Sequence, residues 1–463
     1  MVFASGVFLY YFLPLFLVLY ALVPQRFRSL LIATASYVFY GWWRPDFVLL
    51  MWVSTVVDFT CGKRIIRAQG LQQKGKPWLL LSLCVNLGLL AYFKYFNFGV
   101  DTLNAIMEPF GGTSYHFAEI ILPVGISFYT FQTLSYTIDV YWGKAAPVRS
   151  FRDFMCYVAL FPQLVAGPIV RYNTIADQLH TRTHTRSKFY RGLLAFQAGL
   201  AKKILIADVL GGVADSAFSS GGGLDTMSAW IGTLAYTFQI YFDFSGYSDM
   251  AIGLGLMMGF RFPINFNQPY RAVSITDFWR RWHISLSAFL RDYLYIPLGG
   301  NKKGAVRTYI NLSLTMLIGG LWHGASWTFI AWGAYQGFWL VFERLIGKRS
   351  FYASAPRFLQ IAITFVLVMF GWVFFRCENI GEAFQYIATM FGADSGATRA
   401  LALRPIHALA AVGGALVLWG FPTTQQLIYK ARASWVLPLQ LAFWIALLHL
   451  HYVSHVPFLY YQF

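Results

Sequence analysis

The chain has 463 residues, of which 57% are hydrophobic, 19% are aromatic and only 12% are charged, and its formal net charge is +17. A soluble domain carries about 25% charged residues, so this composition excludes an ordinary soluble protein and indicates a polytopic membrane protein. The positive charge does not indicate nucleic-acid binding, because lysines and arginines cluster between apolar runs, as they do in cytoplasmic loops of membrane proteins.

The first part of the chain alternates apolar runs with basic loops. Val7–Val23, Phe47–Cys61 and Trp78–Phe93 are apolar runs, and the first and the last of them are predicted to be membrane spans. The loop between the last two is rich in Lys and Arg and is therefore predicted to lie in the cytoplasm.

The next two segments are less uniform. Ile120–Trp142 contains proline, glycine, several hydroxyl side chains and Asp139, so we expect it to pack against other helices or a polar cavity rather than against lipid. Pro162 and Pro168 within Phe154–Val170 predict a kinked or broken helix.

A polar, basic stretch follows from Arg171 to Arg191. His180 and His184 lie four residues apart, a spacing that can place two metal ligands on one helix face. No Glu or Cys completes the set, so we predict a solvated loop and no metal site.

Two later apolar stretches contain charged residues. Lys202 and Lys203 interrupt Gly199–Leu210 and are interpreted as anchors at the membrane interface. Ala229–Phe260 has a polar centre that contains Asp243 and Asp249, and a carboxylate at this depth must pair with a cation or line water. Two interpretations remain. The carboxylates form an ion pair or a helix cap at a break around Ser245-Gly246, or they form a polar wall of a cavity that also holds His323, a histidine in the uncharged stretch described below.

The interval from Arg261 to Arg307 holds an amphipathic helix rather than a clear membrane span. Ser274 and Asp277 match a helix-start pattern, and the following residues to Leu298 place His283 on a face beside tryptophans. This pattern is typical of an interfacial or re-entrant helix. Lys302 and its basic neighbours then predict a cytoplasmic loop.

The stretch from Tyr309 to Phe342 has no charged residue and is too long for one straight span. Gly319 and Gly320 near its middle predict a break within Gly319–Ala325. His323 then lies at membrane depth, where an ionisable side chain indicates either a functional site or a neutral histidine bonded between helices.

Further spans are predicted at Phe358–Phe375, Leu401–Phe421 and Val436–Tyr452. Together the patterns predict an all-α polytopic membrane protein with about 11 to 13 membrane segments, some of them broken or re-entrant. We expect one domain over residues 1–463, with a core at about 120–343 and an aromatic tail at 452–463.

Several blocks resemble the membrane-bound O-acyltransferase family, in the bacterial branch that acetylates polysaccharides such as alginate. The strongest are DFWRRWHISLSAFLRDYLYIPLGGN and GGLWHGASWTFIAWGAYQG, supported by YFDFSGYSDMAIGLGLMMGF, LPVGISFYTFQTLSYTIDVY and FPQLVAGPIVR. The resemblance runs to about Glu343 and more loosely beyond. It implies a ring of helices around a central tunnel that contains the catalytic His323, with His283 as a second polar position.

The resemblance also implies the reaction. Acetyl is taken from a cytoplasmic donor, expected to be acetyl-coenzyme A with no bound cofactor, and is delivered across the bacterial inner membrane. The expected partners are membrane lipids, periplasmic acetyltransferase proteins and an exported polysaccharide, with alginate as the first choice and cellulose as the second. Residues expected to line the tunnel or contact the donor are Asp243, Ser245, Arg280, Arg281, Trp282 and Trp322.

The C-terminal residues Phe458–Phe463 resemble the aromatic terminal motif of small partner proteins in D-alanylation systems. That motif maps an acyl-carrying tyrosine onto Tyr460, and the alternative is an aromatic anchor at the membrane interface. Two further alternatives for the whole chain remain open. One is a polysaccharide or lipid transporter without chemistry, and the other is a scaffold for periplasmic acetyltransferases.

Overall fold

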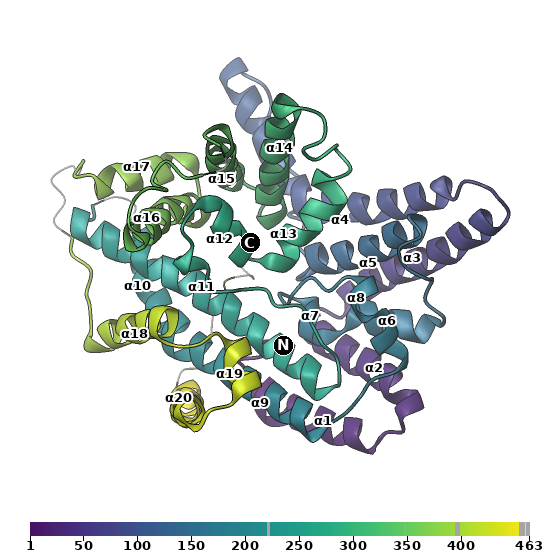
Figure 1. Cartoon of the computed structure of the whole chain (residues 1–463). Coiled ribbons are helices and arrows are strands. Elements are labelled where there is room, and N and C mark those ends of the chain that lie inside the picture. The colour runs from purple at the N-terminus through teal and green to yellow at the C-terminus, as the bar shows by residue number, and fades with distance from the viewer. Residues whose placement is uncertain (220–222, 348, 394–398, 453–458, 460–463) are drawn as a thin grey trace. The chain divides into compact units, whose positions relative to one another are not determined.

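The computed structural model describes residues 1–219, 223–347, 349–393, 399–452 and 459 (Figure 1). These residues form helices and loops, with one isolated β-bridge between Leu224 and Arg399, which confirms the all-α class. The chain forms two compact units: residues 1–192 with 254–263, and residues 193–253 with 264–463.

The first unit is built from helices that are mostly apolar. They are η1 (Val7–Phe12), α1 (Leu13–Leu22), η2 (Gln25–Phe27), α2 (Arg28–Gly41), α3 (Asp46–Gly70), α4 (Lys76–Met107), η3 (Glu108–Phe110), α5 (Ile126–Tyr141), α6 (Phe151–Ala159), α7 (Phe161–Leu164), α8 (Tyr172–His180) and the start of α9 (Arg186–Lys202). As predicted, the proline-containing segment is broken, because α6 ends at Ala159 and α7 is a single short turn.

Helices α3, α4 and α5 lie side by side (Figure 1). The carboxylate of Asp58 on α3 is fully buried and accepts hydrogen bonds from Ser82 Oγ at 2.6 Å and from Asn86 Nδ2 at 2.9 Å. Almost all of α5 is buried, including its polar residues. This segment therefore packs against helices, as its mixed composition predicts.

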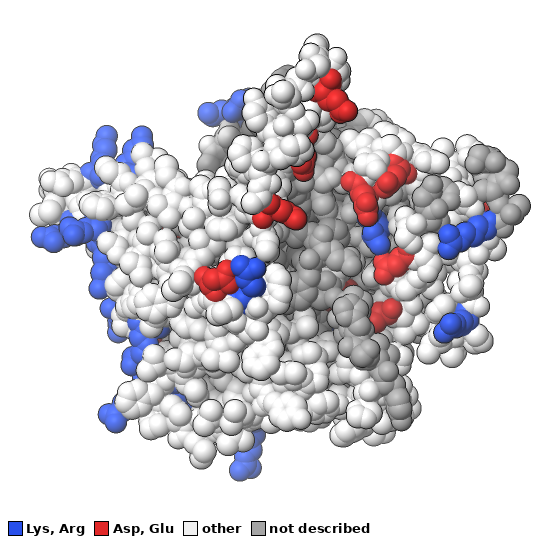
Figure 2. All heavy atoms as spheres, turned by 180° about the vertical axis from the view of Figure 1, so that it is seen from behind, with Lys and Arg blue, Asp and Glu red and all other residues white. Residues whose placement is uncertain are grey.

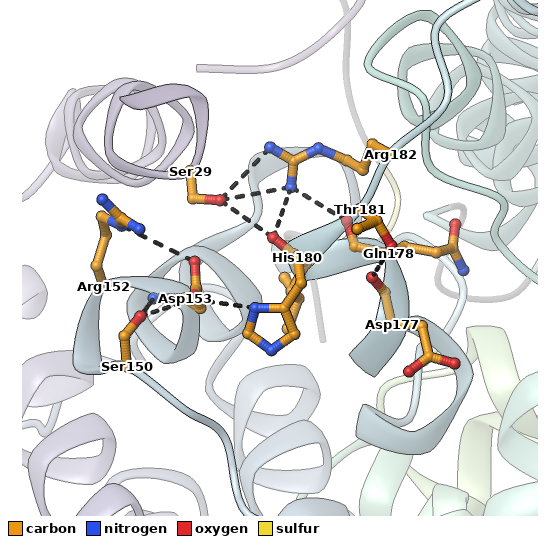
Figure 3. A network of polar contacts seen from close by, with 10 residues as sticks. Ser29, Ser150, Arg152, Asp153, Asp177, Gln178, His180, Thr181 and Arg182 are labelled. Carbon is orange, nitrogen blue, oxygen red and sulfur yellow. Dashed lines mark hydrogen bonds and ion pairs between the residues drawn. The ribbon is translucent and has the colours of Figure 1, made fainter. Parts of the chain in front are cut away.

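The two histidines with metal-like spacing have separate partners. His180 ends α8 and lies 3.4 Å from Asp153, which Ser150 also contacts (Figure 3). His184 follows in the next loop and bonds the Tyr20 hydroxyl at 2.9 Å. The two side chains therefore do not converge on one site.

The second unit holds the remaining helices. They are η4 (Lys203–Ala207), α10 (Asp208–Phe218), α11 (Thr226–Met257), η5 (Pro269–Arg271), α12 (Ile275–Arg281), α13 (Ile284–Leu290), η6 (Arg291–Tyr295), α14 (Ala305–His323), α15 (Trp327–Leu345), α16 (Arg357–Arg376), α17 (Ile380–Met390), α18 (Pro405–Ala415), η7 (Leu416–Gly420), α19 (Thr424–Lys430) and α20 (Ala433–Tyr452).

Helix α11 is continuous through its polar centre, so the break considered at Ser245-Gly246 is wrong. Gly246 serves close packing instead. A Cβ atom at Gly246 would lie 2.7 Å from the carbonyl oxygen of Gly199 on α9, and a Cβ atom at Gly199 would lie 2.3 Å from the carbonyl oxygen of Gly246. Only glycines allow the two backbones to approach this closely.

Helices α14 and α15 form a closely packed pair (Figure 1). The predicted break exists, but it begins one residue after His323 and ends at Ser326, whose side chain caps α15. The helix continues through Gly319 and Gly320, because Gly320 is needed for packing: a Cβ atom there would lie 2.2 Å from the carbonyl oxygen of Phe329.

Within the described part of the chain, three helices are long and apolar enough to cross a membrane: Lys76–Phe110, Arg357–Arg376 and Ala433–His451. A bent pair, Pro405–Gly420 with Thr424–Lys430, raises the number to four if it forms one span. Figure 2 shows a face on which most side chains are uncharged, with Lys and Arg along its left margin and with Asp, Glu and a few Lys and Arg in its centre and right half. Many large apolar side chains are exposed, as expected of a surface that faces lipid.

Candidate active site

His323 is the last residue of α14 and is 6% exposed. Aromatic rings surround its imidazole, with ring centroids at 5.0 Å for Trp322, 5.2 Å for Trp332 and 5.3 Å for Phe375. The helix ends here because Gly324 and Ala325 leave the helical path before Ser326 caps the next helix. The end of helix α14 therefore places a histidine side chain within an apolar interior.

His283 lies beside it, with 6.1 Å between the two imidazole centroids, and is fully buried. The prediction of one continuous amphipathic helix is wrong at this point. Helix α12 ends at Arg281, and α13 begins at Ile284 with His283 as its N-cap residue at φ +41°. A non-glycine residue in this left-handed region is strained, and the strained bend turns the imidazole toward His323.

Asn265 holds His283 in one orientation, and no pattern in the sequence points to this residue. Its Oδ1 accepts from the backbone N–H of Ser285 at 3.3 Å and from the Ser285 hydroxyl at 2.9 Å, and it lies 3.1 Å from His283 Nδ1. An oxygen at this position requires the proton on Nδ1. In the neutral ring Nε2 is therefore the basic nitrogen, and no described residue forms a hydrogen bond with it.

A buried carboxylate fixes the helix that leads to His283. Glu343 on α15 is 3% exposed and accepts from the backbone N–H groups of Ile275 and Thr276 at 2.8 and 2.9 Å. The predicted start pattern is confirmed as well, because the Ser274 side chain accepts from the N–H of Asp277. An anion at a helix N-terminus is stabilised by the helix dipole, so α12 is joined firmly to α15.

A large cavity of about 470 Å³ reaches His323 from one side. Its wall is mostly apolar and also contains Arg291, Asn301 and Arg344, of which Arg291 and Asn301 are exposed, near in the sequence to the basic segments around Lys302 and Arg349. These basic segments are predicted to lie in the cytoplasm. The cavity therefore connects His323 with the side of the molecule that the charge pattern assigns to the cytoplasm.

A much smaller chamber of about 10 Å³ lies on another side of His323. This volume has room for one water-sized group. Every residue of its wall is 6% exposed or less. The wall consists of Ile240, Asp243, Phe244, Trp282, His323, Trp332, Trp372, Phe375 and Leu459.

Asp243 is the acidic residue of this chamber, and it is paired. Lys203 Nζ lies 2.7 Å from Asp243 and 2.5 Å from Asp208, while the backbone N–H of Leu459 donates to Asp243 at 3.1 Å. Lys202 pairs with Asp249 in the same way. Asp243 therefore forms an ion pair without the helix break that the sequence suggested, and it lies in the wall of a chamber that His323 also lines. The prediction of two interface anchors is wrong, because these lysines turn inward to the carboxylates of α11.

The other predicted site residues are placed as follows. Trp282 lies in the wall of the small chamber, and Trp322 is buried against both histidines. Ser245 lines a separate cavity with Lys202. Arg280 is exposed and Arg281 pairs with Asp277, so neither belongs to the wall of the large cavity. Tyr460 lies outside the described residues.

The arrangement suits proton transfer. The centroids of the two imidazoles lie 6.1 Å apart, and aromatic rings pack around the imidazole of His323. A neutral imidazole next to the large cavity can accept a proton from a hydroxyl group and return it to a leaving group.

The chain is similar to known proteins over most of its length. The model of the membrane-bound O-acyltransferase family matches residues 147–381. The probable alginate O-acetylase AlgI of Azotobacter vinelandii is 55% identical over 84% of this chain and 78% of its own length. The protein of the same name from Pseudomonas aeruginosa is 54% identical over 84% and 75%. The peptidoglycan O-acetyltransferase of Helicobacter pylori is 38% identical over 85% and 80%.

Proposed function

The chain belongs to the membrane-bound O-acyltransferase family and is an O-acyltransferase, and we propose that it takes acetyl groups from acetyl-coenzyme A in the cytoplasm and delivers them across the bacterial inner membrane to alginate during its export. The observation that carries the proposal is the position of His323 between a large cavity and a small buried chamber. Because the chain is an enzyme, the two alternatives that involve no reaction, a transporter and a scaffold, are set aside.

The proposed reaction is transfer of an acetyl group from a thioester to a hydroxyl. His323 accepts the proton of the attacking hydroxyl as its oxygen bonds to the carbonyl carbon. The carbon–sulfur bond then breaks, and the imidazolium returns the proton to the departing thiolate. The imidazole of His283, whose centroid lies 6.1 Å from that of His323, assists this proton transfer. The aromatic walls limit hydrolysis of the thioester by water.

The family's ring of helices is the arrangement that we propose for the membrane. In it, about 11 to 13 segments surround a tunnel at His323, and many segments are too short or too broken to span alone. The short helices α12 and α13 and the break after His323 support this proposal. The basic segments would then lie on the cytoplasmic side of the inner membrane.

The large cavity is the proposed donor entrance. Arg344 and Arg291 line this cavity, where a guanidinium can bind the phosphates of coenzyme A. The sequence predicts Arg280 and Arg281 in this role, but neither is among the residues that line this cavity.

We expect Arg344→Gln to raise the KM for acetyl-coenzyme A about tenfold, because a hydrogen bond to a charged group contributes about 1.5–3 kcal/mol, and to change kcat much less. Arg280→Gln is the matched control and is expected to leave the KM unchanged. Initial rates of coenzyme A release in isolated membranes give both constants. A larger effect from Arg280→Gln than from Arg344→Gln would move the donor contact back to the predicted arginines.

The acceptor is tested in a strain that lacks the gene. Restoring the gene should restore acetyl groups on alginate, measured by NMR of the purified polymer. If the gene restored acetyl groups on cellulose, or on the peptidoglycan named for the Helicobacter pylori relative, and left the acetyl content of alginate unchanged, that polymer would replace alginate as the acceptor.

We further propose that Tyr460 supplies the attacking hydroxyl, takes the acetyl group from the thioester and passes it to the final acceptor, while His323 transfers the proton. Its neighbour Leu459 belongs to the wall of the small chamber and bonds Asp243 there, which supports a role for the tail beside His323. A tyrosine hydroxyl can act as a covalent nucleophile when a base lies close. A periplasmic acetyltransferase or the polymer itself would then take the acetyl group.

Tyr460→Phe is therefore expected to abolish polymer acetylation while the protein still accumulates in the membrane, because only the hydroxyl oxygen is lost. In the unaltered protein, an acetyl group on Tyr460 should be detected by mass spectrometry when downstream acceptors are deleted. Tyr461→Phe is the matched control. Full acetylation in Tyr460→Phe would leave this residue as an interface anchor.

A further inference from the structure

The large cavity and the small chamber meet at two residues, because His323 and Trp332 belong to both walls. In the proposed reaction the carbonyl carbon of the thioester must lie beside His323. The sulfur and the long coenzyme arm lead back into the large cavity, which is their way in. The rest of the acyl group, on the other side of the carbonyl carbon, therefore faces the small chamber.

The chamber is walled by rings that support one another. Trp372 lies between Trp282 and Trp332, with centroid distances of 4.9 and 5.9 Å, and is 5.5 Å from Phe375. Its indole N–H donates to the Tyr270 hydroxyl at 3.1 Å, which fixes the orientation of the ring. Interiors packed in this way tolerate added methylene groups poorly.

From this geometry we propose that the chamber limits the length of the transferred acyl group, and that Ile240, Trp372 and Phe375 set the limit. The free volume of about 10 Å³ holds a group the size of one water molecule, and a methyl group is about that size. An acetyl group fits, whereas a butyryl group must displace a buried ring or the Ile240 side chain. This inference rests on the proposed donor and on His323 as the base.

The first measurement is a donor series with the unaltered protein. Membranes are supplied with acetyl-, butyryl- or hexanoyl-coenzyme A labelled in the acyl group, and transfer is counted after subtraction of a His323→Ala background. An extra methylene in a filled apolar pocket costs about 10- to 200-fold in rate. We therefore expect acetyl to be preferred over butyryl by about 100-fold or more.

The second measurement enlarges the chamber. Ile240→Ala and Phe375→Leu should each reduce the preference for acetyl over butyryl by about tenfold or more, because each removes side-chain volume from the wall. Matched controls are available. Ile252 lies on the same helix as Ile240, and both side chains are 4% exposed. Phe374 is the buried neighbour of Phe375. Neither Ile252 nor Phe374 lines the chamber. Ile252→Ala and Phe374→Leu should leave the preference unchanged.

The outcomes separate the two proposals. Transfer of butyryl as fast as acetyl by the unaltered protein, with both dependent on His323, would overturn the length limit and leave the proposed function standing. The length limit would also be overturned if the preference for acetyl over butyryl changed equally in Ile240→Ala and Ile252→Ala, and equally in Phe375→Leu and Phe374→Leu. Absence of any His323-dependent acetyl transfer would instead contradict the proposed function.

Discussion

His323→Ala is expected to reduce polymer acetylation by about 100- to 10,000-fold, the usual contribution of a general acid or base. The imidazole is the titratable group that the large cavity and the small chamber have in common. Without it, the attacking hydroxyl keeps its proton and the thiolate leaves without one. The measurement is the acetyl content of the exported polymer from a strain that carries the variant as its only copy.

The variant must be compared at equal protein levels, because the loss of a buried side chain can also reduce stability. His449→Ala is a suitable control, since His449 lies on α20 and lines neither cavity at His323. Both variants should accumulate in the membrane. Near-normal acetylation in His323→Ala would exclude this residue as the catalytic base.

The second large effect is expected at the Asn265–His283 pair. His283→Ala should reduce the rate about 100-fold, the lower end of what one acid–base group contributes. Asn265→Leu should have a similar effect, because it removes the oxygen that keeps the proton on His283 Nδ1. Asn265→Asp retains an acceptor at this position and should restore most of the rate. Acetyl transfer in isolated membranes measures all three variants.

This rescue separates a role in positioning from a role in packing. If His283 is only a histidine packed beside tryptophans, thermal stability and rate should fall in parallel in every variant. A loss of kcat in Asn265→Leu at unchanged thermal stability, restored by Asn265→Asp, supports the positioning role. Equal rates in Asn265→Leu and the unaltered protein would contradict it.

Long uncharged runs made much of the site predictable from the sequence. A histidine within an uncharged stretch is costly unless it is used or paired, and this reasoning identified His323. The glycines predicted a break within Gly319–Ala325, but the helix continues to His323 and the break starts at Gly324. The mixed polarity of Ile120–Trp142 likewise predicted a buried helix, which α5 confirms. In both cases the composition of a single segment is enough for the prediction, because placing polar groups in an apolar setting costs free energy.

Contacts between distant segments could not be predicted in this way. Asn265 lies 18 residues before His283 in a loop without a pattern, and the strained bend at His283 has no composition signal because its neighbours suit a helix. The lysines at 202 and 203 matched an interface pattern, yet they pair with carboxylates on α11. Gly246 was interpreted as a helix break, whereas it allows close approach to Gly199.

The most direct test of His323-dependent acetyl transfer uses the purified protein in lipid vesicles with labelled acetyl-coenzyme A. We predict that the unaltered protein releases coenzyme A and transfers the label to Tyr460 or to an added acceptor, and that His323→Ala does neither. Equal release of coenzyme A and equal transfer of label by the two proteins would contradict the account.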